Sequence, residues 1–299
     1  MIETNFKITH LNRYEYSDGV SLAYNEVKLT PKDFSHPLLE QSCLSHELLI
    51  SPKPQDQRQR QDFFGNQVSY FNISSHYQKM SVTSNSVVKR KLKVKSSEVK
   101  NYLHTRLAPL SWQTARQNPP EFSPFHLASS FVPLLSELKA YAQISFDKQP
   151  LAFNALNDLM QRIHHDFRFK PGATHINTPL SEIAKTMTGV CQDYSHFMIS
   201  CVRSMGLACR YVSGYLETLP PPGQPKLQGV DASHAWVSVY LPSFGWLDFD
   251  PTNNLIPLDQ HITIAWGRDY ADVSPLKGVI YGGGSHKLHV AVDMERKKA

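Results

Sequence analysis

The chain has 299 residues, 41% hydrophobic and 19% charged, which is ordinary globular composition and is long enough for two packed modules. The formal net charge of +5 is small and the Lys and Arg residues are scattered, so the charge gives no reason to expect a nucleic-acid partner. No run of about 18 apolar residues occurs and the first residues lack the pattern of a signal peptide, so we expect a cytoplasmic protein without a membrane segment.

Four cysteines are too few for a disulfide scaffold in a chain of this length, and none of them forms a CxxC pair. We therefore expect free thiols. Cys43, Cys201 and Cys209 are interpreted as small packing residues, which leaves Cys191 for separate consideration.

Residues 1–96 alternate apolar and polar side chains in short runs separated by turn residues, which predicts an antiparallel β-sandwich domain. The basic residues Lys89, Lys91, Lys93 and Lys95 would share one strand face, and we interpret that face as solvated rather than as a binding site. The polar stretch Gln55–Gln61 is expected to be a loop, and Gly65-Asn66 after it suits a hairpin turn.

Residues 97–150 contain many prolines and predict a connector with short helices. Residues 151–299 form the expected third segment, a catalytic domain that ends in a C-terminal strand. Its first helix is predicted over Leu151–Phe167 from apolar residues at intervals of three and four. Thr178-Pro179 then predicts the start of a short helix that ends near Thr186 to Gly189.

From Gly189 onward the pattern predicts one helix and then three strands. An apolar stripe after Cys191 indicates a helix that Gly206 ends. The expected strands are Arg210–Glu217, Ser233–Leu241 and Gly245–Asp250, with an exposed Pro-rich loop at 220–223 and a last strand at Leu288–Met294. The whole chain is thus predicted to be an α+β protein in which a helix that begins at Cys191 packs on an antiparallel sheet.

Cys191 is the first candidate for chemistry because it opens a predicted helix. Unpaired backbone N–H groups and the positive end of the helix dipole favour the nucleophilic thiolate at such a place. A single cysteine is more often a small apolar packing residue, so the other residues of the site decide the matter.

His234, at the start of a predicted strand, is placed to serve as a base for that thiol. If Leu241-Pro242-Ser243 is a three-residue hairpin loop, Tyr240 pairs with Phe244 and His234 lies opposite Asp250. The carboxylate would then orient the imidazole. Asp248 shares the face of Asp250 and is the rival, and a four-residue loop would separate the histidine from both.

These motifs resemble the core of bacterial transglutaminase-like proteins. They are Gly189-Val190-Cys191-Gln192-Asp193-Tyr194-Ser195-His196, Arg210-Tyr211-Val212-Ser213-Gly214-Tyr215-Leu216, His234-Ala235-Trp236-Val237, Gly245-Trp246 and Phe249-Asp250-Pro251-Thr252-Asn253. The residues around Asp62–Asn66, the segment 267–273 and the last strand are similar to the N-terminal and closing parts of the same bacterial proteins.

The resemblance implies a papain-like core in which Cys191 is the nucleophile, His234 the base and Asp250 the orienting acid, and it selects Asp250 over Asp248. It implies attack on an amide of a peptide or protein substrate, with a thioester resolved by water or by an amine. We expect hydrolysis more than crosslinking. No calcium loop or other cofactor motif is present, so no cofactor or metal is expected.

The sequence leaves open the second oxyanion donor, the residues that border a cleft, and two alternative functions. The backbone N–H of Cys191 is one expected oxyanion donor, whereas the second cannot be named, and Gln192 and His196 are interpreted as pointing or packing elsewhere. Tyr215, Trp236, Trp246 or the 220–230 loop could border a cleft, although buried packing fits the aromatic residues equally well. The alternatives are a non-catalytic binding scaffold with the same fold and, less well supported, a zinc enzyme. The sequence does not indicate an oligomeric state.

Overall fold

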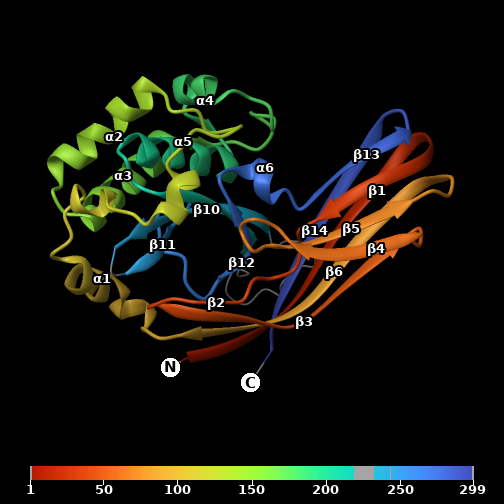
Figure 1. Ribbon diagram of the computed structural model, residues 1–299, viewed down its shortest axis with the longest axis horizontal. Coiled ribbons are helices and arrows are strands. Elements are labelled where there is room, and N and C mark those ends of the chain that lie inside the picture. Colours follow the sequence, from red (N-terminus) through yellow and green to blue (C-terminus); the bar gives the residue numbers. More distant parts are fainter. Residues whose placement is uncertain (1, 219–231, 243, 298–299) are drawn as a thin grey trace, which may run out of the picture.

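The computed structural model describes residues 2–218, 232–242 and 244–297. A large curled β-sheet forms one lobe, and helices packed on a small sheet form the other (Figure 1). The described residues include no helix that is long and apolar enough to cross a membrane. The predicted loop at 220–230 lies outside the described residues.

The large sheet has eight antiparallel strands. Its order is β2-β3-β6-β1-β5-β4, and β13 and β14 both pair with β1. The strand bounds are β1 Ile2–Val27, β2 Phe34–Ser35, β3 Leu39–Ser51, β4 Asp56–Gln61, β5 Gln67–Ile73, β6 Tyr77–Leu92, β13 Leu276–Gly282 and β14 His286–Lys297. The β1–β6 register shifts between Glu15 and Val20, and an irregularity of this kind bends a strand.

The expected sandwich is corrected to this single sheet. Its apolar face is buried by curling, so that residues of β1, β5 and β6 such as Val20, Phe71 and Val82 meet in one cluster. Alternation along the chain predicts one buried face, but it does not reveal whether a second sheet or the same sheet covers that face. The antiparallel β module itself is confirmed.

Within the large sheet, one local prediction was wrong and another is confirmed. Gln55–Gln61 was expected to be a loop, but Asp56–Gln61 forms edge strand β4, whose mostly exposed side chains leave no apolar alternation to detect. The predicted turn is confirmed between β4 and β5, where Gly65 has φ +70°. Lys89 and Lys91 lie on the outer face of β6, whereas Arg90 between them is buried.

The helical lobe begins within the stretch expected to be a connector. Its helices are α1 Val99–Leu107, α2 Ser136–Lys148, α3 Ala152–Asp166, α4 Leu180–Thr186, α5 Cys191–Ser204 and α6 Tyr270–Val273, with 3₁₀ turns at Ser96–Glu98, Thr114–Arg116 and Pro120–Phe125. The helix predicted over 151–167 is confirmed as α3. The short helix starts one residue later than expected, because Pro179 rather than Thr178 is its N-cap.

A four-stranded antiparallel sheet with the order β11-β10-β9-β12 lies against α5. Its strands are β9 Cys209–Leu216, β10 Ala232–Leu241, β11 Gly245–Phe249 and β12 His261–Gly267, and a two-stranded parallel ladder joins β7 Arg168–Phe169 to β8 Thr188–Gly189. The helix after Cys191 and the strands predicted before and after His234 are confirmed.

The two lobes share an apolar interface. Phe6 and Ile8 of β1 and Val292 and Met294 of β14 pack with Tyr215 of the small sheet in one buried cluster. The C-terminal strand predicted around residues 288–294 thus lies in the large sheet, beside β1, and not in the small one. This interface fixes one face of β1 and β14 next to the start of α5.

Candidate active site

The start of α5 places Cys191 at the edge of a cavity of about 380 Å³ that His234 also lines. The helix begins there because the Asp193 carboxylate accepts the Val190 N–H at 2.7 Å. The Thr174 hydroxyl donates to the same carboxylate at 2.7 Å. A side chain three residues into a helix that bonds back to the N-cap backbone is half of a capping box, so this sequence fixes the position of the nucleophile candidate.

Gly189 is required for this arrangement. A Cβ at Gly189 would lie 2.3 Å from Asp193 Oδ2. We predict that Gly189→Ala lowers the free energy of unfolding by roughly 1–3 kcal/mol. It should also slow alkylation of Cys191, because the helix start must shift. Chemical denaturation and labelling of the same sample measure both effects, and an unchanged denaturation midpoint would contradict the prediction.

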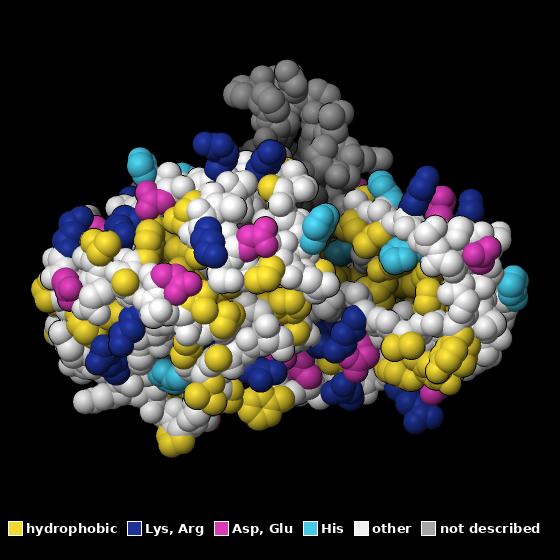
Figure 2. Space-filling view, turned by 90° about the horizontal axis from the view of Figure 1, so that it is seen from above, with side chains coloured by type: hydrophobic (Ala, Val, Ile, Leu, Met, Phe, Trp, Pro, Cys, Tyr) yellow, Lys and Arg dark blue, Asp and Glu magenta, His cyan; other side chains and the backbone are white. Residues whose placement is uncertain are grey.

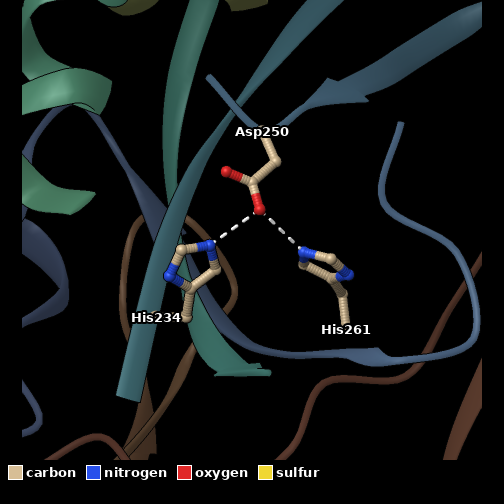
Figure 3. A group of neighbouring side chains, drawn as sticks. All are labelled: His234, Asp250 and His261. Atoms are coloured by element: carbon tan, nitrogen blue, oxygen red, sulfur yellow. Dashed lines mark hydrogen bonds and ion pairs between the residues drawn. The ribbon is translucent and has the colours of Figure 1, made fainter. Parts of the chain in front are cut away.

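His234 and Asp250 meet at the end of the small sheet (Figure 3). His234 Nε2 donates to Asp250 Oδ2 at 2.8 Å, and both side chains are buried. Leu241 pairs with Gly245 and Tyr240 with Trp246, so the register differs by two residues from the predicted one. Since side chains alternate with a period of two, the shift leaves His234 and Asp250 on the same face, as predicted.

Asp250 holds a turn and the histidine at the same time. Its Oδ1 accepts the backbone N–H groups of Thr252 and Asn253 at 3.0 and 3.1 Å, and the Asn253 side-chain amide donates to Oδ2 at 2.8 Å. Pro251 cannot continue the strand ladder, so the chain turns directly after the carboxylate. The rival Asp248 accepts the indole N–H of Trp236 at 2.9 Å instead.

His261 is a member of the site that the sequence analysis missed. Its Nε2 donates to the same Asp250 Oδ2 at 3.0 Å from the first residue of β12, and it is buried (Figure 3). The available signal was a histidine that opens an alternating strand, as His234 does. That signal is weak in a chain with 14 histidines.

The His234 pKa rises to about 10, because its hydrogen bonds and charge interactions with Asp250 and Cys191 outweigh burial, which alone would lower it. Burial would raise the pKa of Asp250, but its bonds to His234 and His261 hold that pKa well below the ordinary value. Burial lowers the pKa of His261, against the opposing effect of Asp250. The arrangement thus favours a charged His234 and an ionised Asp250 with a neutral His261 beside them.

This ion pair predicts a specific pH dependence of stability. His234 has a raised pKa, so its contribution is fully present below its ordinary pKa of 6.5 and is lost as the pH rises toward about 10. The Asp250 contribution is present above its ordinary value and is lost in acid. The difference in unfolding free energy between the wild type and His234→Gln should therefore shrink between pH 6.5 and 10. A difference that stays constant across this range would contradict the ion pair.

The ring and carboxylate atoms of His234, Asp250 and His261 lie within 4.8 Å of one another, and their types suit a metal ion. However, Asp250 Oδ2 already makes direct hydrogen bonds to both rings and to Asn253. These contacts would have to open to admit an ion. The arrangement is therefore better described as a hydrogen-bonded carboxylate.

The structure also locates the other residues that the sequence suggested for the site or for packing. Tyr215 and Trp236 are buried, and Trp246 packs on Phe122 and Phe125, so none of the three lines the cavity of Cys191. His196 is stacked on Phe131 and accepts the Tyr270 N–H at 3.2 Å, which confirms its packing role. Gln192, expected to point elsewhere, does line the cavity. Cys201 and Cys209 are buried, as predicted.

Comparison with known proteins assigns the chain to one family. A model of the transglutaminase-like superfamily matches residues 139–251, and a model of the bacterial transglutaminase-like N-terminal region matches residues 6–89. The uncharacterized protein Rv2569c of Mycobacterium tuberculosis is 38% identical over 302 aligned residues, which cover 97% of this chain and 92% of that protein. The chain belongs to the transglutaminase-like superfamily, in the branch that carries the bacterial N-terminal region.

Two more distant similarities complete the comparison. A protein-glutamine gamma-glutamyltransferase of Pseudomonas aeruginosa is 32% identical over 143 residues, covering 45% of this chain and 21% of that enzyme. A solved structure from Cytophaga hutchinsonii, described as a candidate cysteine protease, superposes with a TM-score of 0.78 at 19% identity and covers 100% of this chain and 92% of the other. The latter supports the arrangement of both lobes.

Proposed function

We propose that the protein is a cysteine-dependent acyl-transfer enzyme that cleaves amide bonds of peptides or proteins, with Cys191 as nucleophile, His234 as base and acid, and Asp250 as orienting carboxylate. The observation that carries the proposal is the His234 ring, which is hydrogen-bonded to Asp250 and lines the same cavity as Cys191. Interaction with Cys191 is also one of the causes that raise the pKa of His234. A thiol, an imidazole and a carboxylate in that order form a nucleophilic triad.

The reaction follows from these contacts. The thiolate of Cys191 attacks the amide carbonyl carbon and forms a C–S bond, the C–N bond breaks, and His234 gives its proton to the departing amine. Water then attacks the thioester, gives a proton to His234 and releases the carboxylic acid and the thiolate. Because Asp250 fixes Nε2 as the donor, Nδ1 is the ring nitrogen available for these transfers.

The charge that develops on the carbonyl oxygen needs hydrogen-bond donors. Cys191 is the first residue of α5, so its backbone N–H is among those that have no partner within the helix. Gln192 lines the same cavity. These features support a helix-start contribution to the oxyanion site.

The decisive experiment is iodoacetamide labelling of Cys191 over a pH series, with the site identified by mass spectrometry. We expect fast alkylation at about pH 6, where an ordinary thiol is mostly protonated, and loss of that rate in His234→Ala. The half-buried Cys43, whose pKa is raised by burial, is an internal reference within each sample. If Cys191 reacts as slowly as Cys43 and His234 has no effect, the protein is a binding scaffold with this fold.

Hydrolysis and amine transfer are separated by product analysis. We favour water as the acceptor, and the expected products of a cleaved peptide are a free acid and an amine. A primary amine added at millimolar concentration should therefore give little new amide by mass spectrometry. Amide as the main product would show that the acyl group is transferred to amines, and the Pseudomonas relative is named a protein-glutamine gamma-glutamyltransferase.

We also propose that the protein is cytoplasmic and that its activity does not depend on a metal ion. All four cysteines are free, which supports the cytoplasmic location expected from the sequence. We also expect that chelators leave alkylation and cleavage unchanged. Loss of both after chelation, together with bound zinc in metal analysis, would favour the alternative metal site at His234, Asp250 and His261.

A further inference from the structure

The large sheet forms one wall of the cavity that holds Cys191. On the helical side the cavity is lined by Val190, Cys191 and His234. On the opposite side it is lined by residues of β1 and of the β13–β14 hairpin, which are His10, Asn12, Tyr14, Leu276, Leu288 and Val290. The N-terminal module is therefore part of the candidate active site.

The apolar residues of this wall continue the buried interface between the lobes. On the face shared by β1 and β14, His10 pairs with Val292, Asn12 with Val290 and Tyr14 with Leu288. Val292 is only 2% exposed, but Val290 is 43% and Leu288 is 49% exposed. Figure 2 shows hydrophobic side chains gathered in a hollow on the lobe that carries the large sheet. The face is thus apolar where it meets the cavity and is left open by the described residues.

Hydrogen bonds hold the buried end of the wall, and the wall carries no Lys, Arg, Asp or Glu side chain. The His10 ring bonds to the Tyr215 hydroxyl at 2.8 Å through Nδ1 and to the Asn12 amide at 3.1 Å through Nε2. Burial lowers the pKa of His10 to about 4, against the opposing effect of Asn12, so the ring is neutral near pH 7. Among the described residues that line the cavity, none is Lys, Arg, Asp or Glu.

We infer that Tyr14, Leu276, Leu288 and Val290 form a sheet-face subsite that receives a bulky, uncharged apolar side chain of the peptide next to the amide attacked by Cys191. This inference rests on the proposed function. Substrate pockets commonly combine apolar walls with a few polar groups, and a volume of about 380 Å³ accommodates a residue such as leucine or phenylalanine with its flanking backbone.

The test compares electrophilic peptides that differ in one side chain. N-chloroacetyl dipeptide amides that carry Leu, Phe or Asp beside the chloroacetyl group alkylate a thiolate by forming a C–S bond and releasing chloride. Iodoacetamide measures the reactivity of Cys191 without a side chain. We expect the Leu and Phe probes to react with wild-type Cys191 roughly ten to a hundred times faster than the Asp probe. The iodoacetamide rate of each variant shows whether the thiol itself has become more or less reactive.

Matched variants assign the preference to the wall. Leu288→Asn combined with Val290→Thr should remove most of the Leu-over-Asp ratio, because both changes keep size while adding polar groups to the subsite. Val279→Thr is the control. Val279 is a 62% exposed apolar residue of the same hairpin that does not line the cavity, so that variant should keep the wild-type ratio.

The outcomes separate the two proposals. Slow iodoacetamide labelling of wild-type Cys191 overturns the proposed function itself. Fast labelling with equal rates for the Leu and Asp probes, or a ratio that persists in the double variant, leaves the enzyme proposal standing and overturns the subsite. A ratio that falls equally in Val279→Thr also overturns it, because the effect would then not depend on the cavity wall.

Discussion

Replacement of Cys191 by serine is expected to lower the rate of peptide cleavage by roughly 10⁴-fold or more, because a hydroxyl with the same neighbours is a far weaker nucleophile at neutral pH. Cys191 lies at the start of α5 and lines the cavity, so the loss of one sulfur atom should not disturb the fold. Cleavage of a diverse peptide pool, followed by mass spectrometry, measures the change.

The matched control for that variant is Cys43→Ser. Cys43 is also partly exposed, and its thiol donates to the Ser45 carbonyl in the large sheet, away from the cavity. The control should retain the wild-type rate. Equal activity of wild type and Cys191→Ser would remove the nucleophile from the proposed mechanism.

Asp250→Asn is expected to lower cleavage by about 10²- to 10⁴-fold while the protein stays folded, because the amide group places a donor where His234 needs an acceptor and so disfavours the required tautomer. Asp250→Ala should in addition destabilise the protein by about 3–5 kcal/mol. The alanine leaves His234, His261 and two backbone N–H groups without their acceptor.

Asp248→Asn is the comparison that distinguishes the two carboxylates. The Asp248 carboxylate accepts the Trp236 indole N–H, and an asparagine oxygen can do the same. Its activity should stay close to that of the wild type. A larger loss in Asp248→Asn than in Asp250→Asn would reverse the assignment. Pre-steady-state kinetics and denaturation curves on the same preparations keep catalytic and structural effects separate.

Local patterns in the sequence were sufficient to predict the parts of the candidate site that depend on local structure. The apolar stripe after Cys191 and the strands before Asp250 are periodic, so the helix start and the shared face of His234 and Asp250 could be predicted. The hairpin closes at Leu241 and Gly245, one residue later on each strand than expected. The two one-residue shifts add up to a register change of two. Because side chains alternate with a period of two, His234 and Asp250 still lie on the same face.

Contacts between distant segments could not be predicted in the same way. His261 reaches Asp250 only because β12 pairs with β9 on the side away from β10, and no local pattern specifies that pairing. Likewise, β4 is defined by its ladder with β5 rather than by apolar side chains. The sheet wall of the cavity depends on β14 returning to β1, which lies at the other end of the sequence.

The pairing of β1 with β14, from Asn5 opposite Lys297 to Tyr16 opposite His286, also sets an order of assembly. A ribosome delivers β1 first and β14 only after the whole helical lobe, so β1 must keep one long edge unpaired during most of synthesis. The groups around Cys191 can meet before that edge is covered, whereas the cavity wall that contains Leu288 and Val290 cannot exist until it is. Any selectivity that this wall provides therefore depends on β14, which is synthesised after the residues of the reactive centre.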